Sequence, residues 1–288
     1  VQSFYEKLKE NGYIYNSEIE QLYCEKCNQF LPDRYVEGKC PHCGAEARGD
    51  QCDACGKPLT PIELIEPYCI TCKSKPIPKK SKHVFFKLSA LTEKLEAWIK
   101  EQKHWPDNAK NFALSWLKEG LQDKDISRDI KWGVPIPDVE GQVFYVWFDA
   151  PIGYITFTKQ LGKDLWTDKD TKLVHFLGKD NIVFHSVYFP GMLIAEGDYI
   201  LPSNIASYEF LTFKGSKLSK SKGGKSIKAR EALDEFPADY WRYVLISLLP
   251  ENHDTDFTWE IFQEIVNNDL NDTIGNFFHR TLTFAKKY

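Results

Sequence analysis

Residues 143–154 read VFYVWFDAPIGY, an apolar run that ends at an aspartate and a proline. The run at residues 143–148 has the length of a strand and consists of residues that favour strands. It predicts a strand buried on both faces, as in a parallel sheet. Residues 149–154 would then lie at the carboxyl end of this strand. Open α/β sheets bind their ligands at that edge, so we expect a ligand site here.

Two further segments fit the same arrangement. Residues 173–177 predict a second buried strand, which is followed by a polar turn at residues 178–181 and then by a helix. A third β-like stretch, residues 209–213, leads into a loop rich in lysine and glycine. Together these segments predict an α/β fold, namely half of a doubly wound nucleotide-binding sheet.

The lysine-rich loop, residues 214–225, reads KGSKLSKSKGGK. Residues 210–230 contain six lysines, one arginine and no carboxylate, although the whole chain has a formal net charge of -4. Glycine and serine let backbone N–H groups approach phosphate oxygens, and lysine adds mobile positive charge. The alternative is a solvated basic loop, which is what most charge runs are. The spacing of lysine and serine inside the run favours a phosphate-binding loop.

All eight cysteines lie in four Cys-x-x-Cys pairs. Four thiolates in a tetrahedron form a structural zinc site, so four pairs predict two Zn²⁺ ions; thioredoxin-like redox chemistry normally uses one pair. Three pairings are possible. We favour a nested one, because a chain that folds back brings its first and last pairs together. The inner site would use Cys40, Cys43, Cys52 and Cys55, and the outer site Cys24, Cys27, Cys69 and Cys72.

The zinc sites are expected to be structural, because four thiolates leave no position open for water or substrate. The cysteine segment is polar, so metal binding would supply its folding energy. In the chain as a whole, 42% hydrophobic residues can fill the core of one large domain with an insert, or of two domains. We find no apolar run of membrane-spanning length and no signal peptide, and therefore expect a cytoplasmic protein without membrane contact.

Residues 217–221, KLSKS, resemble the Lys-Met-Ser-Lys-Ser loop of class I aminoacyl-tRNA synthetases, with Leu218 in place of methionine. Residues 146–154 and 178–180 precede it in the order and approximate spacing found in methionyl-tRNA synthetases. The four-pair insert resembles the two-zinc connective domain of archaeal-type members. Single-zinc members resemble it at the two middle pairs, which favours the same nested pairing. The similarity covers essentially the whole chain.

The resemblance implies ATP-dependent activation of L-methionine and its transfer to tRNA-Met, with Mg²⁺ accompanying ATP. It gives the catalytic role to Lys220, which would contact the phosphates in the transition state, assisted by Lys217. Arg128 matches an arginine that pairs with Asp180, and an ordinary structural ion pair is the alternative. The implied ATP-binding residues are Lys217, Ser219, Lys220, Ser221, Gly178, Asp180 and Arg128. The implied methionine-binding residues are Trp147, Ala150, Pro151, Tyr154 and His185.

The resemblance also implies an order of domains along the chain. The end of a first Rossmann half would occupy residues 1–18, and the zinc-binding connective insert residues 19–82. The second Rossmann half would follow at residues 83–213. The KLSKS loop and a stem-contact fold would occupy residues 214–262, and the start of a helical anticodon-binding domain residues 263–288.

The His-Ile-Gly-His motif of the first Rossmann half does not occur in the 288 residues. We therefore expect activity only when a missing amino-terminal half is supplied, in cis or in trans. Two alternatives remain open. One is a class I synthetase for leucine, isoleucine or valine, although these usually carry a larger editing insert. The other is a zinc-ribbon RNA-binding or complex-forming protein derived from half of a synthetase.

Overall fold

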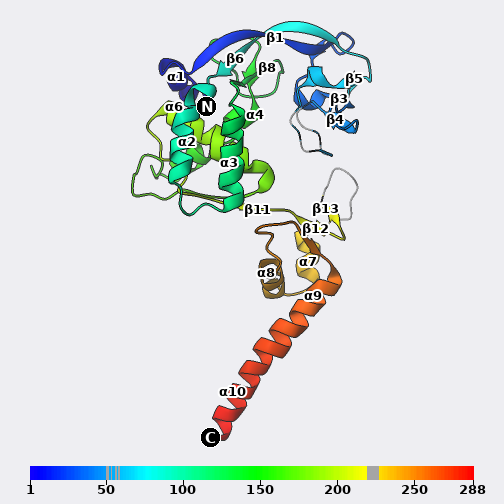
Figure 1. Ribbon diagram of the computed structural model, residues 1–288, viewed down its shortest axis with the longest axis vertical. Helices are drawn as coiled ribbons and strands as arrows, with labels where there is room; N and C mark the ends of the chain where they lie inside the picture. The colour runs from blue at the N-terminus through cyan, green and yellow to red at the C-terminus, as the bar shows by residue number, and fades with distance from the viewer. Residues whose placement is uncertain (50–51, 53, 56, 58, 219–226) are drawn as a thin grey trace. The chain divides into compact units, whose positions relative to one another are not determined.

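The computed structural model describes residues 1–49, 52, 54–55, 57, 59–218 and 227–288 (Figure 1). The chain forms a mixed α/β fold, which confirms the predicted fold class at that level. It divides into two compact units. The first unit comprises Val1–Lys103, Ala113–Leu173 and Val183–Ser203, and the second His104–Phe112, Val174–Ile182 and Asn204–Tyr288.

A long antiparallel strand pair organises the first unit. Strand β1 (Ile14–Cys24) pairs with β6 (Ile77–Phe86) in continuous register from one end to the other. Two short strands, β2 (Gln29–Phe30) and β7 (Lys124–Asp125), complete a sheet with the order β2-β1-β6-β7. Figure 1 shows this ribbon running from the helices of the unit to the small strands β3–β5. The pair therefore carries the cysteine-bearing insert.

The insert is built on a small three-stranded sheet. Strand β3 (Val36–Lys39) lies between β4 (Glu46–Arg48) and β5 (Ile65–Cys69), and both pairings are antiparallel. Two 3₁₀ turns, η1 (Asp33–Tyr35) and η2 (Pro61–Glu63), connect its parts. Its core is small and includes four buried cysteines. The buried residues are Leu22, Cys24, Leu31, Val36, Cys40, Ala47, Cys52, Leu59, Leu64 and Cys69.

Helices form the body of the first unit. Helix α1 (Gln2–Glu10) buries Phe4, Tyr5 and Leu8 and packs against α6 (Phe189–Glu196). The turn η3 (Ser89–Leu91) leads into α2 (Thr92–Glu101). Of the next helix, α3 (Asp107–Glu119), only the part from Ala113 onward belongs to this unit. A glycine allows close packing of α6, since a Cβ on Gly191 would come within 2.7 Å of Leu88 Cδ1. The body therefore has an apolar core of its own.

The predicted strand at residues 143–148 is wrong for most of its length. Strand β9 covers Val143–Phe144 and pairs with β8 (Ser127–Arg128); the chain then turns into α4 (Val146–Asp149) and α5 (Ile152–Gln160). Phe144 and Phe148 are both buried and stack with their ring centroids 5.2 Å apart. Burial of residues four apart is the period of a helix. Because every position in the run is apolar, the pattern could not distinguish the two structures.

The second unit contains two small sheets. Strands β10 (Val174–Gly178) and β11 (Asn204–Tyr208) are parallel, and β10 confirms that residues 173–177 form a strand. The predicted burial of this strand is wrong, because Val174 and Phe176 are exposed. In the other sheet β12 (Leu211–Phe213) is central, parallel to β14 (Thr255–Phe257) and antiparallel to β13 (Ser216–Lys217). The lysine-rich loop therefore begins from a sheet edge, as expected for a loop that follows a strand.

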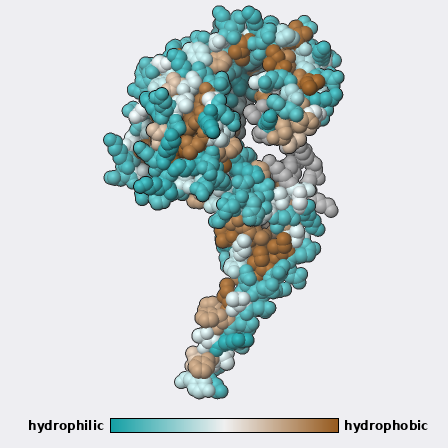
Figure 2. All heavy atoms as spheres, in the orientation of Figure 1, coloured by the Kyte–Doolittle hydropathy of each residue, from teal (hydrophilic) through white to brown (hydrophobic). Residues whose placement is uncertain are grey.

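Helices complete the second unit, after the short turn η4 (Lys179–Asn181). They are α7 (Ala229–Glu235), α8 (Ala238–Ser247), α9 (Trp259–Ile265), the π-helical η6 (Val266–Gly275) and α10 (Asn276–Lys287). Aromatic rings dominate the core between them: Trp241, Phe257 and Phe262 are buried together with Ala232 and Val244. Apolar residues of α10 are exposed, and Figure 2 shows them as tan patches between polar ones.

Candidate functional site

The eight cysteines form two clusters of four. Cys24, Cys27, Cys69 and Cys72 form one cluster, and Cys40, Cys43, Cys52 and Cys55 form the other, with all ligand sulfurs of a cluster within 4.8 Å of one another. This is the nested pairing expected from the sequence. The pairing of β1 with β6 produces the outer cluster, because it brings the first cysteine pair to the last.

The sulfur spacing fits a tetrahedral metal site. The measured Sγ–Sγ distances are 3.4 Å for Cys24–Cys72 and 3.9 Å for Cys27–Cys69. In the inner cluster they are 3.8 Å for Cys40–Cys55 and 3.6 Å for Cys43–Cys52. A tetrahedron with Zn–S bonds of about 2.3 Å has S–S distances of about 3.8 Å. The eight cysteines are free thiols, and both clusters have the composition and spacing of structural zinc sites.

Three of the predicted methionine-binding residues come together around α4 and α5. The Trp147 ring on α4 stacks on Phe184 with centroids 4.3 Å apart. The Tyr154 hydroxyl on α5 lies 3.1 Å from His185 Nε2, within hydrogen-bond distance. Phe184 and His185 belong to the π-helical turn η5 (Phe184–Tyr188), a geometry that is frequent at functional sites. Ala150 and Pro151 form the link between α4 and α5.

A cleft of about 470 Å³ opens beside α4. Residues 32–35 of the insert line one part of it, and Tyr145, Trp147, Asp149 and Ala150 line another. Burial raises the pKa of the Asp149 carboxyl. The cleft is large enough for a small ligand, and its lining combines aromatic rings with the charged side chains of Asp33, Arg34, Arg128 and Asp149. Of the five predicted methionine-binding residues, Trp147 and Ala150 line this cleft. Its use as the amino-acid pocket stays a prediction.

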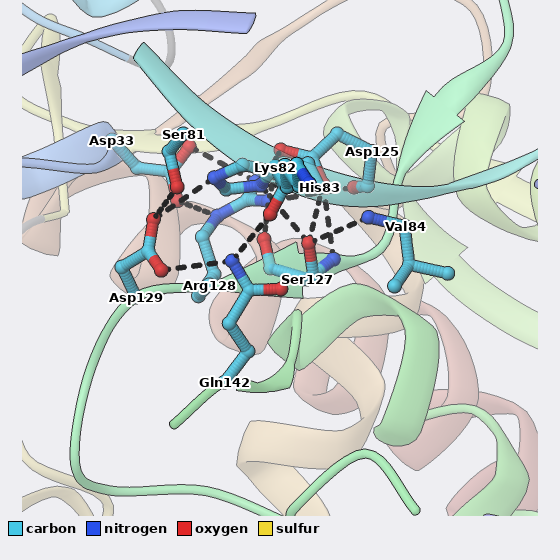
Figure 3. Close-up of polar contacts among 10 residues, drawn as sticks. All are labelled: Asp33, Ser81, Lys82, His83, Val84, Asp125, Ser127, Arg128, Asp129 and Gln142. Carbon is cyan, nitrogen blue, oxygen red and sulfur yellow. Dashed lines mark hydrogen bonds and ion pairs between the residues drawn. The ribbon is translucent and has the colours of Figure 1, made fainter. Parts of the chain in front are cut away.

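A buried polar network includes Asp33 and Arg128, which line this cleft (Figure 3). His83 on β6 is fully buried, with Nδ1 3.0 Å from Asp125 and Nε2 3.0 Å from Asp129. Burial alone would lower the pKa of His83, but the hydrogen bonds to Asp125 and Asp129 raise it to about 9. Burial likewise opposes ionisation of Asp129, but hydrogen bonds from His83, Gln142 and Ser81 lower its pKa. His83 is therefore a buried imidazolium between two carboxylates, a role that its sequence neighbourhood did not indicate.

Arg128 extends the network to the insert. Its Nε donates to Asp33 Oδ2 at 2.7 Å, and its Nη1 donates to Asp125 Oδ2 at 3.1 Å. Burial opposes the charge, but the carboxylates of Asp33 and Asp125 raise the pKa of Arg128 above its ordinary value. Both contacts are ion pairs with carboxylates of the first unit, and the sequence predicted neither of them. Pairing of Arg128 with Asp180, which belongs to the second unit, stays a prediction.

The second unit holds the predicted ribose-binding turn. Gly178 ends β10, and Asp180 lies so close that a Cβ on Gly178 would come within 3.0 Å of Asp180 Oδ1. Lys179 Nζ lies 2.7 Å from both Glu209 and Asp254. Burial opposes its charge, but hydrogen bonds to Asp254 and Glu209 raise the pKa of Lys179. This ion-pair cluster fixes the turn, and no motif in the sequence indicated it.

The predicted phosphate-binding loop begins with a tight hairpin. Lys214 and Gly215 connect β12 to β13 with φ angles of 49° and 71°. Asp256 Oδ1 accepts hydrogen bonds from the Gly215 N–H at 2.8 Å and from the Thr212 hydroxyl at 2.6 Å. Lys217 ends β13. The predicted residues Ser219, Lys220 and Ser221 lie outside the described residues.

Comparison with known proteins identifies the family. The model for class I tRNA synthetases (M) matches residues 1–282. The chain belongs to this family. This match confirms the resemblance to methionyl-tRNA synthetases that the sequence motifs indicated.

Relatives of this synthetase family match the chain over its full length. The methionine–tRNA ligase of Methanocaldococcus jannaschii is 55% identical over 290 residues, which cover 100% of this chain and 44% of that protein. The enzyme of Thermofilum pendens is 46% identical over 300 residues, covering 100% of this chain and 53% of that protein. The chain thus spans about half the length of the curated relatives it matches.

A solved synthetase structure shares the fold. Mycobacterium tuberculosis methionyl-tRNA synthetase bound by methionyl-adenylate superposes with a TM-score of 0.69 at 25% identity. The match covers 99% of this chain and 52% of that one. Within the described part of this chain, no helix is both long enough and apolar enough to cross a membrane.

The first prediction concerns the metal. We expect Cys40→Ser to reduce bound zinc from two ions to one per chain, because the inner cluster loses one of four thiolates. Proteolysis should then cut the insert preferentially, since metal binding supplies its folding energy. Metal analysis combined with limited proteolysis measures both effects. Cys24→Ser is the matched variant for the outer cluster, and unchanged metal content and proteolysis in Cys40→Ser would contradict the assignment.

The second prediction concerns pH. The pKa of His83 rises from an ordinary value of about 6.5 to about 9 on folding. Its stabilising effect is therefore complete below pH 6.5 and is lost as the pH rises through 9. We expect His83→Gln to remove up to roughly 3 kcal/mol of this pH-dependent part of the free energy of unfolding. Denaturant unfolding at pH 6 and pH 9.5 measures it.

The control for this experiment is His279→Gln, which removes an exposed histidine from α10. It should leave the pH dependence of unfolding as in the wild type. A His83→Gln variant whose stability falls with pH as steeply as that of the wild type would show that His83 is not charged in the fold.

Proposed function

We propose that this chain is the catalytic part of a methionyl-tRNA synthetase that carries the methionine pocket, the lysine loop and the zinc-bearing insert. The reaction is ATP-dependent activation of L-methionine to methionyl-adenylate, followed by transfer to tRNA-Met. The observation that carries the proposal is the 55% identity to a methionine–tRNA ligase over the full chain. Methionyl-adenylate in the solved structure of the tuberculosis enzyme supports the same reaction.

The aromatic site is suited to methionine. The side chain of methionine is flexible and apolar and ends in a polarizable sulfur, which makes favourable contacts with aromatic rings. Trp147 with Phe184 offers a stacked pair of rings, and Tyr154 with His185 offers a polar pair. Ala150 and Pro151 would complete the wall. We assign these residues to recognition of the side chain, with no part in bond making.

The lysine loop supplies positive charge for the chemistry. A methionine carboxylate oxygen attacks the α-phosphorus of ATP and pyrophosphate leaves, so negative charge on the phosphates must be stabilised. We assign this role to Lys220, assisted by Lys217, with Ser219 and Ser221 in the same loop. Gly178 and Asp180 would receive the ribose, and Mg²⁺ would accompany the ATP phosphates.

The remaining assignments follow the family. The two cysteine clusters would hold structural Zn²⁺. Residues 1–18 and 83–213 would belong to the Rossmann halves, residues 214–262 would include the stem-contact fold, and residues 263–288 would begin the anticodon-binding domain. We propose a cytoplasmic enzyme whose His-Ile-Gly-His half is provided in cis or in trans.

The test of the proposed function is ATP–pyrophosphate exchange with methionine, leucine, isoleucine and valine, with the His-Ile-Gly-His half present. Methionine-dependent exchange, and none with the other three, is the expected result. RNA binding without exchange would instead favour a zinc-ribbon RNA-binding protein.

The third prediction separates binding from chemistry. We expect Lys220→Ala to slow adenylate formation by about 10²-fold while methionine binding stays nearly unchanged, because the lysine acts mainly in the transition state. Single-turnover kinetics and equilibrium binding measure the two quantities. Lys228→Ala, which removes the same charge outside the KLSKS motif, is the control. Equal losses of binding and rate in Lys220→Ala would contradict the assigned role.

A further inference from the structure

Asp33 joins the cysteine-bearing insert to the body of the first unit. Its two carboxylate oxygens accept from Arg128, with Nε–Oδ2 at 2.7 Å and Nη2–Oδ1 at 3.2 Å. Arg128 is 8% exposed, so this is a two-point ion pair at a largely buried guanidinium. Such paired contacts fix orientation as well as distance. Asp33 therefore holds one edge of the insert at a defined place.

The insert in turn fixes the backbone of Asp33. Its φ angle is 46°, in the left-handed region that non-glycine residues seldom adopt and that aspartate tolerates better than most. The Gly49 N–H donates to the Asp33 carbonyl oxygen at 3.1 Å, and a Cβ on Gly49 would come within 2.6 Å of that oxygen. A conformation of this kind persists where the surrounding fold determines it. The position of the carboxylate thus depends on the folded insert.

On the other side of the ion pair, Arg128 determines the start of α4. The guanidinium lies 3.9 Å from the centroid of the Tyr145 ring. The carbonyl of Tyr145 accepts from the N–H groups of Phe148 and Asp149, and the Tyr145 N–H donates to Ile126. Tyr145 therefore begins the helix that carries Trp147. A change at Asp33 can reach Trp147 through three contacts. They are the ion pair of Asp33 with Arg128, the packing of Arg128 on the Tyr145 ring, and the hydrogen bonds of the Tyr145 carbonyl with α4.

The cleft beside α4 lies on this path. Residues 32–35 line it together with Arg128, Tyr145 and Trp147, so both ends of the path form its wall. A ligand in the cleft would meet the insert and the aromatic residues at once. The shape of the cleft therefore depends on how firmly the insert is docked.

We propose that Asp33 is a positioning residue that couples the folded, metal-holding insert to the aromatic wall of the cleft through Arg128 and Tyr145. Metal binding in the cysteine clusters then sets the place of Trp147 without any contact between metal and substrate. Where the inference names methionine as the ligand of the cleft, it rests on the proposed function. The residue acts through Arg128, so it should affect substrate binding more than the chemical step.

The experiment uses protein labelled with 5-fluorotryptophan, in which ¹⁹F NMR gives one line for each tryptophan and Trp147→Phe identifies the line of Trp147. Asp33→Asn removes the charge and keeps both the shape and the tolerance of the left-handed backbone. Glu66→Gln is the matched control: Glu66 also has a left-handed φ, of 52°, and pairs with Lys39 inside the insert at 2.6 Å. Zinc content and circular dichroism of each variant report whether it folds.

The expected result is a shift or broadening of the Trp147 line in Asp33→Asn and none in Glu66→Gln. Removing zinc with a chelator should move the same line in the wild type and cause no further change in Asp33→Asn, because the two changes break one path. In methionine activation, Asp33→Asn should raise KM for methionine about tenfold and change kcat less than about threefold.

Two results would overturn the inference. One is an unchanged Trp147 line in a folded, zinc-loaded Asp33→Asn variant. The other is a chelator effect on the Trp147 line that is equally large in the wild type and in Asp33→Asn. This second result would contradict the inference even if the variant folded poorly. Absence of activation in every variant, with the Trp147 line moving as expected, would count against the proposed function and support the positioning role of Asp33.

Discussion

The antiparallel pairing of β1 with β6 is the constraint on which the first unit depends. Its register pairs Tyr23 with Ile77 at one end and Ile14 with Phe86 at the other. The first end brings the outer cysteine pairs together, and the second end enters the apolar core of the body. A slip of one residue would turn every side chain to the opposite face, so the register has to be fixed at both ends. Metal ligands can fix the end at Tyr23 and Ile77, and the apolar core of the body can fix the end at Ile14 and Phe86.

The body end is also where the first unit buries charge. His83 on β6, with Asp125, Asp129 and Arg128 on neighbouring segments, forms a network in which each charged group has an opposite partner. Burial of an unpaired charge is costly, whereas a fully paired network restricts the fold to one arrangement. The same network reaches Asp33 in the insert and Tyr145 at the start of α4. One set of contacts therefore aligns the strand pair, the insert and the aromatic cleft.

Sequence patterns predicted the parts of this molecule that local chemistry determines. The nested cysteine clusters follow from spacing and from a chain that folds back, and β10 follows from a short, mainly apolar run. The segment at residues 143–148 failed because its apolar residues have no periodicity, so a short strand and a helix look alike. The partners of Arg128 were not predicted, because Asp33 lies 95 residues away in the sequence. His83 was missed for a similar reason, although Asp125 and Asp129 four residues apart are a weak signal for a buried cation.

Two four-thiolate metal sites would fix the end of the strand pair that lies away from the body. Zinc K-edge X-ray absorption of the purified protein, together with a count of bound zinc, tests whether they do. We expect two zinc ions per chain, each with four sulfur ligands at about 2.3 Å and no nitrogen or oxygen ligand. A single zinc ion, or a nitrogen or oxygen ligand, would contradict this expectation.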